Sequence, residues 1–63
     1  MQDSKQDTIN AFVAITKESC REIIERYIDR MLKLPASSLQ NLYSTVKQQG
    51  CIAIVYWFQD MDQ

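Results

Sequence analysis

Cys20 and Cys51 are the residues of this 63-residue chain best suited to covalent chemistry. Two cysteines allow one disulfide, and these two are not spaced as a Cys-x-x-Cys motif. Because the chain has no histidine, neither thiol has the usual base that would activate it as a nucleophile. We therefore expect two reduced cysteines acting as small apolar core residues in a cytoplasmic protein, with a redox-switchable bridge as the alternative.

Carboxylates recur along the middle of the chain at Glu18, Glu22, Glu25 and Asp29. General acid–base catalysis needs carboxyl groups in a cleft with shifted pKa values, and adjacent exposed carboxylates on a helix provide neither condition. A di-metal helical bundle would need Glu-x-x-His motifs, which a chain without histidine cannot supply. The sequence therefore predicts a protein that is not an enzyme, with no catalytic residues, no cofactor and no metal site.

A basic stripe runs through the same segment. Arg26, Arg30 and Lys33 share one side of a helix, with Arg21 nearby. Such a stripe could contact the phosphates of DNA or RNA. Acidic residues are interleaved with it, and the chain as a whole has 7 basic and 8 acidic residues, a net charge of −1. We expect a solvated face with ion pairs, and keep a nucleic-acid surface made of these four residues as the alternative.

The most distinctive segment is the uncharged apolar run over residues 51–58, which contains the only tryptophan. A surface helix normally shows one apolar stripe, whereas this run is apolar on all sides. A chain of this length has a small body and buries only about 60% of its unfolded surface. The run therefore predicts contact with a second molecule, either another copy of the chain or a different protein.

Apolar residues at spacings of three and four predict one long helix over about 5–33. Pro35 ends this helix, because proline disfavours the helical conformation in the residue before it. A second helix is expected over about 37–49, capped by one of the two serines that follow the proline and ended by Gly50.

The segment after the glycine has two interpretations. In the first, the second helix continues or restarts and reaches about residue 61. In the second, residues 51–58 form a strand that pairs with its copy in a dimer, because their side chains also favour strands. In both cases the chain is a single small domain over 1–63, with 1–5 and 60–63 expected to be frayed.

The two helices and the short turn between them predict an antiparallel helical hairpin. With the turn centred near Pro35, residues whose numbers sum to about 71 lie at one level. Apolar residues then face each other across the hairpin: Cys20 opposite Cys51, Tyr27 opposite Tyr43, and Phe12 and Val13 opposite Trp57 and Phe58.

One hairpin leaves outer apolar positions in water, so we expect two copies to form a four-helix bundle, with two-fold symmetry as the commonest solution. The fold class is therefore predicted to be all-α. The residues expected in the core or dimer interface are Phe12, Val13, Ile23, Ile52, Val55, Tyr56 and Trp57.

The remaining features limit the functional class. The longest apolar run is far shorter than the roughly 20 residues needed to cross a bilayer, and we predict no membrane partner. We expect a cytoplasmic, non-catalytic adaptor or regulator that binds another protein, of the kind found among phage or plasmid accessory proteins. The alternative is a regulator that binds nucleic acid through the basic stripe.

Overall fold

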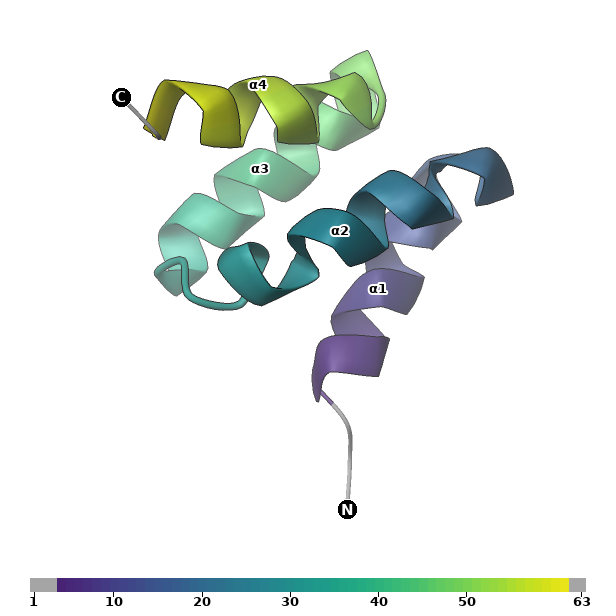
Figure 1. Cartoon of the computed structure of the whole chain (residues 1–63), viewed down its shortest axis with the longest axis horizontal. Helices are drawn as coiled ribbons and strands as arrows, with labels where there is room; N and C mark the ends of the chain where they lie inside the picture. The colour runs from purple at the N-terminus through teal and green to yellow at the C-terminus, as the bar shows by residue number, and fades with distance from the viewer. Residues whose placement is uncertain (1–3, 62–63) are drawn as a thin grey trace.

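All the regular elements of the chain are helices in a computed structural model that describes residues 4–61, with side chains described over 4–59. The prediction of an all-α chain is confirmed. Since the described residues contain no strand, the alternative of a strand over 51–58 is wrong. The elements, in chain order, are α1 (Ser4–Ile15), the short 3₁₀ helix η1 (Glu18–Cys20), α2 (Arg21–Met31), α3 (Ala36–Gln49) and α4 (Ile52–Met61), as drawn in Figure 1.

The ends of the chain were predicted to be frayed over 1–5 and 60–63. Helix α1 already includes Ser4 and Lys5, and α4 continues to Met61, so the helices extend into both predicted ends. The rest of the prediction falls on residues 1–3 and 62–63, which lie outside the described residues.

The first predicted helix is divided, so a single helix over 5–33 is wrong. Helix α1 ends at Ile15, and the hydroxyl of Thr16 donates a hydrogen bond to the carbonyl oxygen of Phe12 at 2.9 Å. Lys17 is then extended, with φ −111° and ψ 158°. Hydroxyl side chains compete with the helical ladder for backbone groups, and this favours an end here.

The division gives the apolar residues of this segment partners within one chain. A straight helix over 5–33 would be about 43 Å long at 1.5 Å per residue. The whole molecule extends only 36 Å along its longest axis. Because α1 folds back and packs on α2, each of the two helices covers part of the apolar surface of the other.

The second predicted helix restarts after Gly50, as one of the two interpretations expected. Gly50 has φ 88° and ψ 179°, a backbone region that essentially only glycine occupies. Its N–H donates to the carbonyl oxygen of Val46 at 2.7 Å, which closes the end of α3. The chain then turns, and α4 begins at Ile52.

Helix α3 begins one residue earlier than predicted and has no serine cap. Pro35 occupies the capping position, and no side chain caps the helix. The carbonyl oxygen of Pro35 instead accepts the N–H of Leu39 at 3.0 Å. The fixed φ of proline suits the residue that leads into a helix.

The four helices form two pairs that face each other. Helices α1 and α2 form the N-terminal pair, and α3 and α4 form the C-terminal pair, with the chain reversing between them over 32–35 (Figure 1). Between the pairs, α1 packs on α3 and α2 packs on α4. All four helices contribute to one core, which consists of Ile9, Phe12, Ile24, Ile28, Met31, Leu42, Val46, Ala53, Ile54 and Phe58.

The aromatic side chains contact different partners from those that the hairpin register predicts. The ring edge of Phe12 meets the ring of Tyr43, with centroids 5.3 Å apart. Tyr27 stacks on Phe58 at 5.5 Å. The sequence paired Phe12 with Phe58 and Tyr27 with Tyr43. The partners are exchanged because the break after α1 turns that helix toward α3, so that α4 packs against α2.

Candidate functional site

Two exposed large apolar side chains lie on one side of α4. Ile52 is 49% exposed and Tyr56 is 60% exposed, and Val55 beside them is half-buried. Their spacing of three and four places them on one side of the helix. We call these three residues the α4 face. The opposite side of the helix is buried in the core through Ala53, Ile54 and Phe58. Helix α4 therefore packs on one side and is exposed to solvent on the other.

The other residues predicted for the core or dimer interface lie inside the chain or at its edge. Phe12 is 2% exposed and belongs to the core of one chain. Val13, Ile23 and Trp57 are half-buried and pack against that core. The structure therefore brings Ile52, Val55 and Tyr56 together at the surface and separates them from the remaining four.

Charge is distributed unevenly around this face. Six of the seven basic residues and six of the eight acidic residues lie within 1–33. Lys47 is the one charged residue within 34–59. Charged residues are depleted at the centres of protein interfaces and aromatic residues are enriched there, and the α4 face, with Tyr56 and no charge, has this composition.

Arg30 fastens the far half of α4 to α2. Its guanidinium carbon lies 4.8 Å from the ring centroid of Phe58 and 5.7 Å from that of Tyr27, within range of a cation–π interaction. The sequence analysis assigned Arg30 to a basic surface and missed this role. A signal was present, because Arg30 follows Tyr27 by three residues and therefore lies on the same side of α2.

The near end of α4 is fastened by a disulfide between Cys20 and Cys51, whose Cα atoms are 6.1 Å apart. The hairpin register placed these residues at one level, and this juxtaposition is confirmed. The expectation of two reduced thiols is corrected, because the pair lies within the normal Cα separation for a disulfide and the bridge is formed. The bridge joins the residue before α2 to the residue before α4, and both cysteines are half-buried.

The basic stripe is interrupted by acidic partners. The Arg21 Nε lies 2.6 Å from a carboxylate oxygen of Glu18. Arg26 lies 3.8 Å from Glu22, an ion pair of the kind expected on this face. Lys33 is exposed and lines a small pocket of about 350 Å³ with Arg30. The four predicted basic residues thus lie along α2 and its end without forming one uniform positive patch.

One further ion pair connects the two helices of the N-terminal pair. Helical spacing favours a pair between Asp29 and Lys33, four residues apart, but Asp29 instead meets Lys5 of α1, with the ammonium nitrogen 3.3 Å from a carboxylate oxygen. The folding back of α1 brings Lys5 into range, which helical spacing alone could not predict. Both side chains are more than half exposed, so this ion pair contributes little stability.

Among the carboxylates, Glu18 has a perturbed pKa. The hydrogen bond from Arg21 holds the pKa of Glu18 below its ordinary value, and the positive charge of Arg21 acts in the same direction. The same contact raises the pKa of Arg21. Glu18 is largely exposed, so this contact has the properties of a surface ion pair and not those of a general acid or base in a cleft.

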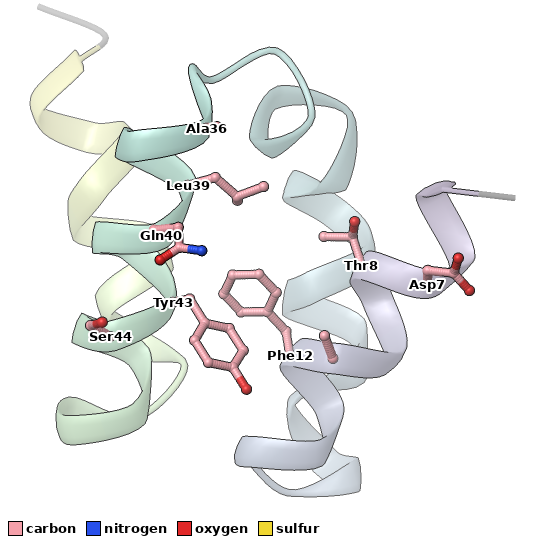
Figure 2. A pocket seen from close by; sticks show the side chains of 9 residues that line it. Asp7, Thr8, Phe12, Ala36, Leu39, Gln40, Tyr43 and Ser44 are labelled. Atoms are coloured by element: carbon pink, nitrogen blue, oxygen red, sulfur yellow. The ribbon is translucent and has the colours of Figure 1, made fainter.

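A groove of about 500 Å³ separates α1 from α3 (Figure 2). Phe12 and Leu39 point into it, and the side chains of Thr8 and Gln40 lie at its edge. The sequence analysis did not predict this groove, because it depends on the folding back of α1. An apolar lining with a few polar groups is typical of small-molecule sites.

Comparisons with known proteins provide no relative for this chain. No family model matches it, and neither a curated protein nor a solved structure matches it. Within residues 4–61, no helix is long and apolar enough to span a membrane. The same part of the chain contains no group of three or more cysteine, aspartate or glutamate side chains placed to hold a metal ion.

Proposed function

We propose that this protein is a small non-catalytic binding protein that forms a homodimer through the α4 face and presents its charged surface to another protein. The observation that carries the proposal is the pair of exposed side chains Ile52 and Tyr56, set on the outer surface of the C-terminal pair, where Lys47 is the one charged residue within 34–59. Exposed apolar side chains grouped on one helix mark a surface that another molecule covers.

A second copy suits the α4 face better than a charged partner. In a two-fold symmetric dimer each patch meets the same patch of the other chain, so any charge would face its own copy. Residues 48–59 contain no charged side chain. The α4 faces of two copies can therefore approach without like-charge repulsion among their own three residues, and Tyr56 can keep its hydroxyl at the rim in contact with water.

The charged N-terminal pair supplies the second surface. In the proposed dimer the outer side of α2 stays in water in both copies, with Arg21, Arg26 and Lys33 alternating with carboxylates. Mixed charges of this kind select partners and orient them more than they add affinity. The dimer would thus present two equal charged surfaces to another protein.

Sedimentation equilibrium tests the dimer. We expect the wild-type chain to approach twice its mass of 7.4 kDa as its concentration rises. The variant Ile52→Ser with Tyr56→Ser should remain at 7.4 kDa with an unchanged circular dichroism spectrum. Leu32→Ser is the matched control, because Leu32 is also an exposed large apolar residue (38%) but lies outside α4. Loss of the dimer in the control alone, or a wild type that stays monomeric, would contradict the proposal.

Affinity purification from cells that express the protein tests the second surface. Arg26→Glu with Lys33→Glu should lose a partner protein that the wild type retains, while the dimer persists. A retained nucleic acid is the opposing outcome. Binding of DNA or RNA that weakens steeply with salt and is lost in the same variant would replace the protein partner with the nucleic-acid alternative.

A further inference from the structure

We propose that the Cys20–Cys51 disulfide is a redox switch for the α4 face, so that its reduction by a dithiol loosens the start of α4 and weakens dimerisation. This inference rests on the proposed function, because it concerns the control of the same dimer surface.

Helix α4 is fastened to α2 at two places. Near its far end, Phe58 stacks on Tyr27 and lies beneath Arg30. At its near end the attachment is covalent, through Cys51, which directly precedes the first residue of the α4 face. Between the two places only Ala53 and Ile54 are buried. The first turn of the helix is therefore held by the bridge together with the burial of Ala53 and Ile54.

The bridge also holds the backbone that starts α4. The carbonyl oxygen of Cys51 accepts the N–H of Ile54 at 3.0 Å, and that of Gly50 accepts the N–H of Ala53 at 3.1 Å. These two bonds form the first turn, in which Ile52 lies. When the sulfur of Cys51 is tied to Cys20, both carbonyl groups are fixed relative to α2, and so is the position of Ile52.

Without the bridge, the first turn of α4 keeps its own backbone hydrogen bonds and the burial of Ala53 and Ile54, but it loses its covalent attachment. The helix is 10 residues long, and isolated helices below about 12–15 residues are marginal in water. Gly50 is exposed, and an added Cβ there would meet no atom within 4 Å, so no side chain packs over this turn, which is held by the backbone hydrogen bonds of Gly50 to Val46 and Ala53. After reduction, the stack at Phe58 still holds the far half, while the half that carries Ile52 is held without a covalent attachment and unwinds more readily.

The switching chemistry is thiol–disulfide exchange. A thiolate of the dithiol attacks one sulfur of the bridge, forms a mixed disulfide, and releases the other cysteine as a thiol. The second thiol of the reductant then attacks the mixed disulfide. Two electrons and two protons reach Cys20 and Cys51, and the reductant leaves as a disulfide. Both cysteines are half-buried, not enclosed, and disulfides in the predicted cytoplasmic location are usually transient and redox-sensing.

The test compares dimer dissociation constants of oxidised and reduced protein by sedimentation equilibrium, with dithiothreitol as the dithiol. Reduction should weaken the dimer at least about tenfold, within the usual range of coupling between two sites. Cys20→Ala with Cys51→Ala should match the reduced wild type and should not respond to dithiothreitol. Equal dissociation constants in both states would overturn the switch and leave the dimer intact. A monomer in both states would overturn the dimer itself.

Hydrogen exchange separates the switch from a general effect on folding. The monomeric variant Ile52→Ser with Tyr56→Ser is measured oxidised and reduced, so that dimerisation has no influence. We expect reduction to speed exchange in the first half of α4 at least about tenfold more than in α1. Equal acceleration in all four helices, or none in α4, would show that the bridge is a structural staple and would overturn the switch.

Discussion

The two helix pairs contribute equal numbers of residues to the core but differ in the charge of their outer surfaces. Each pair contributes five of the ten core residues. The N-terminal pair is surrounded by alternating acidic and basic side chains, whereas Lys47 is the only charge within 34–59 of the C-terminal pair. The core therefore does not distinguish the pairs, and the surface does. A fold this small can share its core between both halves while only one half carries exposed large apolar side chains on a helix.

The largest effect should come from the contact that joins the pairs, the edge of Phe12 on Tyr43. Phe12→Ala should lower the free energy of unfolding by about 3–5 kcal/mol, because it removes a ring that is 2% exposed and leaves a cavity. Denaturation in urea at several protein concentrations measures this loss. It should be the same at every concentration, since the ring lies within one chain.

A milder variant is needed, because a chain of this size has a stability of only about 3–5 kcal/mol and Phe12→Ala would remove all of it. Phe12→Leu should lower the free energy of unfolding by about 1–2 kcal/mol. If the loss depended on protein concentration, Phe12 would belong to the dimer interface, and the equal division of the core between the pairs would no longer hold.

A smaller effect should distinguish the two interruptions between helices, at Lys17 in the N-terminal pair and at Gly50 in the C-terminal pair. Gly50→Ala should cost about 1–3 kcal/mol, because an alanine at φ 88° is strained even though its Cβ has open space. Lys17→Ala is the matched control in the N-terminal pair, where the backbone is ordinary extended chain. It should change the stability by less than about 0.5 kcal/mol. Thermal unfolding compares the two variants, and equal losses would mean that the breaks have the same physical origin.

The smallest effect concerns the ion pairs of the N-terminal pair. NMR titration should give Glu18 a pKa below the ordinary glutamate value, and Arg21→Gln should return it toward that value. Because the folded pKa is the lower one, any stabilisation by this contact is present above the ordinary value and is lost as the pH falls through the folded value. An unchanged pKa in Arg21→Gln would show that Glu18 is influenced by another group.

The sequence predicted what depends on local pattern. Helical spacing identified the all-α class, glycine marked the restart before α4, and the hairpin register placed Cys20 level with Cys51. These features follow from periodicity and from the backbone preferences of single residues. The α4 face was also visible, as the part of the apolar run that the hairpin leaves uncovered.

The tertiary contacts that the sequence could not predict all depend on where α1 ends. No glycine or proline marks it, and the hydrogen bond from Thr16 to Phe12 is available to any threonine in a helix. Once α1 folds back, Phe12 reaches Tyr43, Lys5 reaches Asp29, and the groove opens between α1 and α3. Local spacing contains no information about these tertiary contacts, so all of them were missed together.

The disulfide also determines how the chain responds to force. A pull on the two ends passes through Cys20 and Cys51, because the covalent bridge is the shortest path between them. The 31 residue steps between the cysteines therefore carry no load while the bridge is intact. At about 3.3–3.6 Å per residue, the intact bridge prevents roughly 100 Å of contour length from being extended. Only the segments outside the bridge, which contain α1 and α4, can then be drawn out, and a single-molecule experiment would record reduction as the sudden release of that hidden length.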